Sequence, residues 1–463
     1  MSAASKASIK EKTRLKSFNR QGENMIRQTV FGFKIERTEE ELTARGGLAL
    51  LAEYNHGIGL RDLVERYLPG SGSNRGFKPS IFVDSLVLML QGGGRSFEDL
   101  RELKYEEGLM KLIDVEKIPN PDSVGDWCRR MGNLQMGQKG LEGLGEVRDK
   151  LNHRMMKRDK AEAYTLDADA TGIIAEKADA FYTYKGDKGY MPMVGFLYEL
   201  KLCLYDEFRE GNTAAAFGQK GFYRECKARM PKGKGIGYYR ADSASYQSDL
   251  INALEEDRVK WGITADLDRA VKALIAEIPD GDWREPVKDC GYEVAEAVHT
   301  MNQTKKAFRL VIKRELRRQE NLFEMGKYFH HAVATNWDGN EKNACEVLQW
   351  HNQRGEAENF NKELKIGFGM ERMPCGQTEA NAVFFRVGVI AYNLFIGFKR
   401  LSCPESWVKH TIATFRWKMV QVAGRIVRHS GSIFLKLAVD VAKLELFKGM
   451  RKNIFEMSLA LDG

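Results

Sequence analysis

The sequence predicts an α/β protein with a mostly β stretch in its second half and a helical region at each end. Three observations support this class. Strand-like apolar runs alternate with a helical segment between residues 163 and 265. Charged and apolar residues then alternate between residues 283 and 336, which is typical of an antiparallel sheet with one face in water. Helical periodicity dominates residues 40–160 and the chain from residue 340 onward.

The N-terminal region, residues 1–160, is predicted to be a basic arm (residues 1–30) followed by a helical domain. Pro79–Gln91 has apolar residues at helical spacing and begins with proline, which suits the first turn of a helix. Ser96 stands three positions before an acidic residue at the start of a further helix, the pattern of a capping box. Such short helices are compatible with a helix-turn-helix and equally with a structural bundle.

The strands of the predicted core are spread over the middle of the chain. The strand-like segments of its first part are 163–174, 193–203, 236–239 and 261–265, with a helix at 247–259. The mostly β stretch contains predicted strands at 292–300, 308–313 and 331–335. A long helix is then predicted from Asn340 to Lys365, and helices are expected to continue to the C-terminus.

Charge is unevenly distributed along the 463 residues. The chain carries 72 Lys and Arg against 64 Asp and Glu, a net charge of +8. Residues 1–37 sum to +6 and residues 398–463 to +7, so the middle of the chain is acidic, at −5. Basic ends suggest a polyanionic partner such as nucleic acid, although solvated tails would give the same composition.

Composition argues against several other classes. Arg386 interrupts the longest apolar run, so no membrane span is predicted. The N-terminus lacks the apolar segment of a secretory signal. The seven cysteines are scattered without CxxC spacing, which predicts free thiols in a reducing compartment. His330 and His331 would point to opposite faces of a strand, which does not favour a shared metal ion.

Two acidic sites stand out in the strand-like part of the chain. Asp167 and Asp169 lie two residues apart in an apolar strand, so they share one face, and aspartate is disfavoured in strands. Asp242 follows a predicted strand and precedes a helix, a position where it would also serve as an N-cap. The N-cap alone is a sufficient explanation for Asp242.

A third acidic site lies on the predicted helix that ends at Lys365. His351, Arg354, Glu358 and Lys365 are spaced so that they share one helix face, which an exposed salt-bridged surface would also explain. Two strand-end aspartates and a later glutamate, however, also suit a pair of divalent ions about 3.5–4 Å apart that would promote in-line phosphoryl transfer. Mg²⁺ prefers such carboxylate oxygens, and Arg354 and Lys365 would then face DNA phosphates.

These motifs resemble those of the DDE transposases of bacterial insertion sequences. Within this family, the sequence resembles the branch that has a Tyr-x2-Arg-x3-Glu-x6-Lys helix signature and a β insertion before the catalytic glutamate. The long interval between Asp242 and Glu358 contains the β-like stretch, as that insertion would require. The signature falls on His351, Arg354, Glu358 and Lys365, with histidine in place of tyrosine, and the family's Asp-x-Thr falls on Asp169-Ala170-Thr171.

The resemblance implies an RNase H-like core interrupted by a mostly β insertion. The implied domains are a basic arm and helical DNA-binding domain (1–160), the first part of the core (161–265), the β-rich insertion (266–339), the second part of the core with the glutamate helix (340–400), and a basic helical C-terminal region (401–463). Trp283 and Trp337, in the β-like stretch, are candidates for stacking on a base or for packing in the core.

The resemblance also implies a two-metal site that uses Mg²⁺, for which Mn²⁺ could substitute. The implied catalytic and metal-binding residues are Asp169, Asp242 and Glu358, with Asp167 as the alternative first metal ligand. The implied phosphate-binding residues are Arg354, Lys365 and His351. Glu356 would face away from Glu358 on the helix, so both cannot bind the metals.

The activity implied is cutting and joining of insertion-sequence ends by metal-dependent phosphodiester hydrolysis and strand transfer. The partners would be double-stranded DNA, as terminal inverted repeats and target DNA, and a second copy of the chain in a homodimer on paired ends. The same resemblance implies a nucleoid-associated location in the bacterial cytoplasm. Two alternatives stay open: an RNase H-like nuclease without strand transfer, and a non-catalytic DNA-binding protein.

Overall fold

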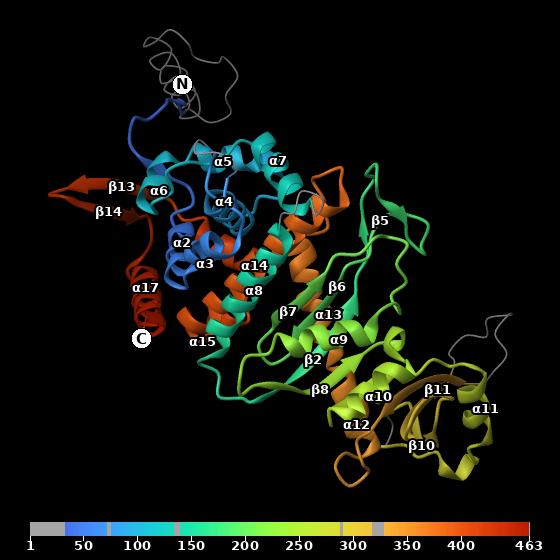
Figure 1. Ribbon diagram of the computed structural model, residues 1–463. Coiled ribbons are helices and arrows are strands. Elements are labelled where there is room, and N and C mark those ends of the chain that lie inside the picture. The colour runs from blue at the N-terminus through green and yellow to red at the C-terminus, as the bar shows by residue number, and fades with distance from the viewer. Residues whose placement is uncertain (1–32, 72–75, 134–138, 288–289, 317–327, 463) are drawn as a thin grey trace, which may run out of the picture. The chain divides into compact units, whose positions relative to one another are not determined.

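A computed structural model describes residues 33–71, 76–133, 139–287, 290–316 and 328–462 (Figure 1). The chain divides into two units, Met1–Glu41 and Leu42–Gly463. The predicted basic arm, residues 1–30, lies outside the described residues, and residues 33–41 contain no helix or strand. All elements below belong to the second unit.

Short helices form the region between residues 48 and 156, as predicted. α4 (Pro79–Gly92) has proline at its first turn and is followed by Gly93, whose φ of 109° suits glycine. Ser96 and Asp99 form the predicted capping box. The other α-helices described in this region are α2 (Leu48–Gly57), α3 (Leu60–Tyr67), α5 (Leu100–Lys104), α6 (Glu107–Leu112), α7 (Pro121–Gly132) and α8 (Gly140–Met156).

A sheet of eight strands follows, and five of its strands form the α/β core. These are β2 (Ala163–Ala170), β6 (Met193–Leu197), β7 (Leu202–Glu207), β8 (Gly235–Ala241) and β9 (Lys260–Thr264), in the order β9-β8-β2-β6-β7. β8 runs parallel to β2 and to β9, whereas β6 runs antiparallel to β2 and to β7. α9 (Gln219–Ala228) and α10 (Ser248–Glu256) connect the last three strands in sequence. The predicted α/β class is confirmed.

The β-rich insertion extends this same sheet. β10 (Glu293–His299), β11 (Phe308–Leu316) and β12 (Tyr328–Thr335) form an antiparallel meander, preceded by α11 (Arg269–Glu277). β12 pairs with β9, so the meander adds three strands to the edge of the core. The predicted strands are therefore present. Trp283 is buried under the Arg314 guanidinium, and Trp337 stacks on Tyr238, so both tryptophans pack within the protein.

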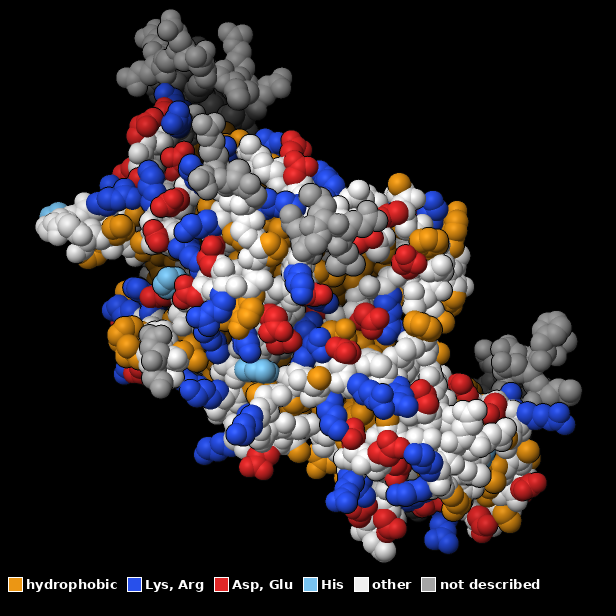
Figure 2. Space-filling model, in the orientation of Figure 1, with side chains coloured by type: hydrophobic (Ala, Val, Ile, Leu, Met, Phe, Trp, Pro, Cys, Tyr) orange, Lys and Arg blue, Asp and Glu red, His pale blue; other side chains and the backbone are white. Residues whose placement is uncertain are grey.

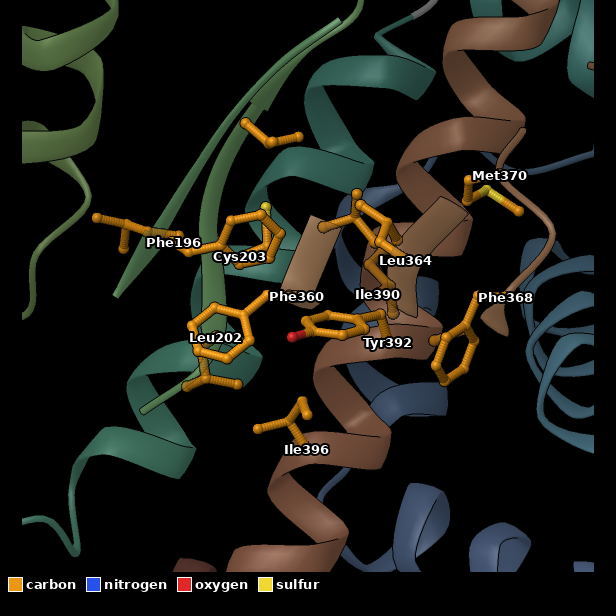
Figure 3. Packing of buried hydrophobic residues seen from close by; sticks show 14 of the residues in the cluster. Phe196, Leu202, Cys203, Phe360, Leu364, Phe368, Met370, Ile390, Tyr392 and Ile396 are labelled. Atoms are coloured by element: carbon orange, nitrogen blue, oxygen red, sulfur yellow. The ribbon is translucent and has the colours of Figure 1, made fainter. Parts of the chain in front are cut away.

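The long helix α14 (Thr378–Ser402) runs through the hydrophobic core. Its length and mean hydropathy of 1.5 would suit a membrane span, but 94% of its most apolar window is buried inside the protein. Figure 3 shows Phe196, Phe360 and Tyr392 packed together, from β6, from the helix that carries Glu358, and from α14. The apolar run is thus that of a core helix. All seven cysteines are free, as predicted.

The C-terminal region differs from the predicted run of helices because it contains a β hairpin. β13 (Gly424–His429) and β14 (Ser432–Leu437) pair through a tight turn in which Ser430 and Gly431 both have positive φ. β13 also pairs with β1 (Leu42–Thr43). β-branched and aromatic residues on both sides of the Ser-Gly pair are the signal for this hairpin. The helical elements are α15 (Glu405–Val408), α16 (Ile412–Phe415), the π-helical turn Arg416–Val420 and α17 (Val441–Asp462).

Candidate active site

Asp169 and Asp242 lie at the same edge of the central sheet. Asp169 is the second-last residue of β2, and Asp242 directly follows β8, the parallel neighbour of β2. Burial, and after it the negative charge of Asp242, raises the pKa of Asp169 to about 6. Such an effect requires the two carboxylates to be close, so the strands bring together the pair that the sequence singled out.

Asp242 also caps the turn that follows it. Its Oδ1 accepts a hydrogen bond from the backbone N–H of Ala244 at 3.0 Å, at the start of the 3₁₀ turn Ser243–Ser245. Asp242 is therefore an N-cap, as its position in the sequence predicts. It fixes the direction of the Asp242 carboxylate at the sheet edge.

The helix expected from Asn340 to Lys365 is interrupted. α12 (Ala344–Asn352) ends before α13 (Arg354–Lys362), and a π-helical turn, Glu363–Gly367, follows. The interruption coincides with a bond from Arg240 Nη1 to the carbonyl oxygen of Trp350 at 2.8 Å. In a continuous helix that carbonyl would accept from the N–H of Arg354. The four-residue signature is therefore spread over three segments.

Arg354 and Glu358 keep their predicted proximity on α13. Arg354 Nη2 lies 3.4 Å from Glu358 Oε1, and Arg354 Nη1 lies 3.9 Å from Asp169 Oδ1. The guanidinium thus sits between the two carboxylates. The Glu358 side chain is 63% exposed, yet its charge also contributes to the raised pKa of Asp169. The three predicted carboxylates therefore belong to one electrostatic site.

Asn361 is a member of this site that the sequence reading missed. It lies one turn after Glu358 on α13 and is buried, and its Nδ2 donates to Asp169 Oδ2 at 3.0 Å. Its Oδ1 is buried without a hydrogen-bond partner among the described residues. Its spacing of three residues from Glu358 is the signal that places both on one helix face.

Asp167 lies deeper in the sheet and has a different partner. Both of its oxygens accept from the guanidinium of Arg240, its cross-strand neighbour on β8, at 2.8 Å each. Both side chains are fully buried, and Arg240 also lies 4.3 Å from the ring centroid of Tyr198. Burial raises the pKa of Asp167 to about 6 despite this partner. The bidentate pair commits Asp167 to holding β2 against β8.

His351 does not lie where a phosphate ligand would. The side chain is buried beneath α12, and its Nε2 lies 3.2 Å from the carbonyl oxygen of Ala241 and 3.4 Å from the hydroxyl of Thr264. Burial lowers the pKa of His351 to about 4, so the ring is neutral at pH 7. A buried neutral imidazole does not attract phosphate, and this placement contradicts the predicted role of His351.

Lys365 reaches back to the residues that follow Asp169. Its Nζ donates to Thr171 Oγ1 at 3.2 Å and to the carbonyl oxygen of Gly172 at 2.6 Å. The side chain is half-buried, and burial lowers its pKa. Lys365 therefore fastens the π-helical turn to the end of β2, in addition to carrying positive charge beside the carboxylates.

The donor set of this site suits a hard divalent cation. Carboxylate oxygens are the ligands that Mg²⁺ and Mn²⁺ prefer, and a cation between Asp169 and Asp242 would relieve their mutual repulsion. The unpartnered Oδ1 of Asn361 is a further oxygen beside Asp169. Across the described part of the chain, no three acidic, histidine or cysteine side chains are close enough to bind one ion together. Glu358 is paired with Arg354, which lies between it and Asp169.

Comparison with known proteins identifies the family. A family model described as the transposase DDE domain group 1 matches residues 25–459. The chain belongs to this DDE transposase family. The family is one of DNA transposases that generally use divalent metal ions, which agrees with the family that the sequence motifs resemble. Among solved structures, the transposase is similar to one described as the piggyBac transposase synaptic complex with hairpin DNA. That match has 10% identity and a TM-score of 0.44, and it covers 90% of this chain and 80% of the other. No curated protein sequence matches the chain.

Proposed function

We propose that this chain cuts and joins the ends of its own insertion sequence, using Asp169, Asp242 and Glu358 as ligands for two Mg²⁺ ions. The observation that carries the proposal is that Asp169 and Asp242 lie together at the ends of adjacent strands, with the Arg354 guanidinium between Asp169 and Glu358. A structural salt bridge would not need a second aspartate close enough to raise the pKa of Asp169. Family membership supports the same chemistry.

The roles proposed for the side chains follow from their contacts. Asp169 and Asp242, on adjacent strand ends, would hold the ions, and Glu358 would complete the set after exchanging Arg354 for metal. Bound divalent ions would supply activation of the attacking oxygen and stabilisation of the leaving one in an in-line displacement. Asn361 would hold Asp169 in its productive rotamer through the 3.0 Å hydrogen bond.

Arg354 would turn from the carboxylates to a DNA phosphate. It is only 19% exposed but borders the exposed Glu358, so a short movement would bring its planar guanidinium to an incoming phosphate. Lys365 would add positive charge while it keeps the end of β2 in place. We assign no phosphate contact to His351 and no metal to Asp167, because their buried bonds occupy them.

The terminal inverted repeats are the proposed DNA substrate, bound by a homodimer on paired ends. The helical region 48–156 and the basic C-terminal region are the surfaces proposed to bind them. Phosphate contacts release counterions, so affinity for end DNA is expected to fall steeply between 50 and 200 mM salt, roughly a thousandfold for six contacts.

Cleavage of end DNA in Mg²⁺ tests the site. Asp242→Ala and Glu358→Ala are expected to lower the cleavage rate at least about a thousandfold while end-DNA binding in a gel-shift assay stays within about threefold of wild type. Glu356→Ala is the matched control, because Glu356 lies on the same helix and borders Tyr198 instead. Wild-type cleavage by either Asp242→Ala or Glu358→Ala would refute the assignment.

A strand-joining assay separates the proposal from its two alternatives. Labelled product joined to a target plasmid supports the transposase. Cleavage without any joined product would indicate the RNase H-like nuclease, and DNA binding without metal-dependent cleavage would indicate the non-catalytic binding protein.

A further inference from the structure

A small sheet beside the site presents large apolar side chains to solvent. Its strands are β3 (Ile173–Ile174), β4 (Phe181–Tyr182) and β5 (Lys188–Tyr190), in the order β3-β5-β4, and we refer to it as the 173–190 sheet. Ile174 and Tyr182 are each 64% exposed, Phe181 is 45% exposed and Tyr184, in the turn after β4, is 76% exposed. Figure 2 shows hydrophobic side chains at the surface where Figure 1 places β5. Such clusters mark binding surfaces.

The 173–190 sheet is fixed to the core and is not a loose loop. Tyr190, at the end of β5, is fully buried; its hydroxyl donates to Asp179 and accepts from Asn381 of α14 at 3.0 Å. Asp179 in turn accepts from the backbone N–H of Thr378, at the start of α14. A side chain at Gly189 would meet the carbonyl oxygen of Ile173 at 2.0 Å, so close strand pairing depends on that glycine. The exposed rings therefore stand on a rigid support.

Lysines are interleaved with the exposed rings. The Nζ of Lys188 lies 5.6 Å from the ring centroid of Tyr182, and the Nζ of Lys185 lies 5.6 Å from that of Tyr184. Alternating aromatic and cationic side chains are the surface that proteins use for single-stranded nucleic acid, where rings stack on bases and cations bind phosphates. A surface for a purely apolar partner would not need the lysines.

The position of the 173–190 sheet links it to the carboxylates. β3 begins four residues after Asp169, and the intervening Thr171 and Gly172 are the residues that Lys365 contacts. Lys185 is also close enough to Lys365 to contribute to its lowered pKa, after the effect of burial. A DNA strand bound across the 173–190 sheet would therefore pass next to the candidate active site.

We propose that the 173–190 sheet binds unpaired DNA bases next to the cleaved phosphodiester, with Tyr182 and Tyr184 stacking on the bases and Lys185 and Lys188 binding the flanking phosphates. This inference rests on the proposed function, because the DNA bound on the 173–190 sheet would be the substrate of the proposed active site. The bases must be unpaired because the faces of paired bases are covered in the duplex. Phe181 points to the other face of β4, so Tyr182 and Tyr184 are the rings available on this surface. Together they expose roughly 300 Å², less than half of one side of a standard protein interface, which favours a nucleic-acid strand over a second copy of the chain.

The test measures stacking and affinity without cleavage. The probe is inverted-repeat DNA with two unpaired 2-aminopurines next to the cleavage position, titrated at fixed salt without divalent metal. Wild type is expected to quench the fluorescence, and the Tyr182→Ala/Tyr184→Ala double variant is expected to bind roughly tenfold or more weakly and to lose the quenching. Tyr182→Phe/Tyr184→Phe should behave as wild type, because phenylalanine stacks equally well.

Controls separate this inference from misfolding and from the proposed function. Phe329→Ala removes an aromatic ring that is 56% exposed on β12, outside the 173–190 sheet and outside the two regions proposed to bind the inverted repeats, and it should leave both signals unchanged. All variants remove exposed side chains, so thermal unfolding should stay within about 2 °C of wild type. Unchanged affinity and quenching in the double alanine variant would overturn the inference, as would loss of self-association with unchanged DNA binding. If Asp242→Ala still cleaves, the proposed function is wrong. The fluorescence and affinity measurements need no metal and no cleavage, so they test base binding by the 173–190 sheet independently.

Discussion

Replacing Asp169 with asparagine is expected to stabilise the protein at neutral pH, although it removes a residue of the candidate site. Burial and the Asp242 carboxylate raise the pKa of Asp169 from 3.8 to about 6, so the ionised side chain is unfavourable in the folded state. A shift of about 2 units corresponds to about 3 kcal/mol at pH values above both pKa values. Asparagine keeps the shape of the side chain without its charge.

The pH dependence of this effect has a definite sign. Between pH 3.8 and about 6, the folded chain keeps a proton on Asp169 that the unfolded chain has lost, so wild-type stability falls as the pH rises through this window. The Asp169→Asn variant lacks this titration. Its advantage over wild type is expected to be about 1.5 kcal/mol at pH 5 and about 3 kcal/mol at pH 8.

Urea unfolding at the two pH values, followed by tryptophan fluorescence, measures this difference. Asp187→Asn is the control, because Asp187 is exposed in a turn and its replacement should change stability by less than about 0.5 kcal/mol. A variant no more stable than wild type at pH 8, or an equal advantage at both pH values, would show that Asp169 is not held under electrostatic stress.

Three further predictions concern individual contacts. Asp167→Ala should lower the free energy of unfolding by about 3–5 kcal/mol in urea titrations, since it leaves the buried Arg240 guanidinium without its counter-charge; a loss below about 1 kcal/mol would contradict this. Asn361→Ala should move the acid limb of the cleavage-rate profile to higher pH, because its bond lowers the pKa of Asp169; an unmoved limb would refute that role. Gly143→Ala should lower stability by about 2 kcal/mol, measured as a lower Tm, because the new Cβ would lie 2.3 Å from a backbone carbonyl oxygen of α3.

Features with a local cause were predictable from the sequence. The capping box at Ser96 and the proline start of α4 depend on neighbouring residues, and both are present. The strands of the insertion were predictable from their alternating charged and apolar residues, and they pair as an antiparallel meander. The wet face expected for them was wrong at Val311 and Val333, because α12 covers that face and buries both side chains. Arg354 and Glu358 keep their contact because a four-residue spacing survives within a short helix.

Features with a distant cause were not predictable in the same way. Helical spacing predicts that His351 shares a face with Arg354. Arg240, more than a hundred residues earlier in the chain, instead binds the Trp350 carbonyl at the point where the helix breaks. The same arginine donates hydrogen bonds to both carboxylate oxygens of Asp167. The two-residue repeat of a strand places Asp167 and Asp169 on one face, so it could not show which of them is free to bind a metal ion. Asn361 gains its importance only from a partner 192 positions away. Each of these outcomes depends on tertiary contacts.

The turn that carries Lys365 also has a consequence for how the protein is made. Its Glu363 accepts from the N–H of Ile412, and its Gly367 carbonyl accepts from Arg416. A nascent chain that has only reached residue 400 already contains every carboxylate of the site, but it lacks these anchors. Contacts over such separations form slowly and late. Translation products that end before residue 412 would therefore lack both anchors of the turn that carries Lys365.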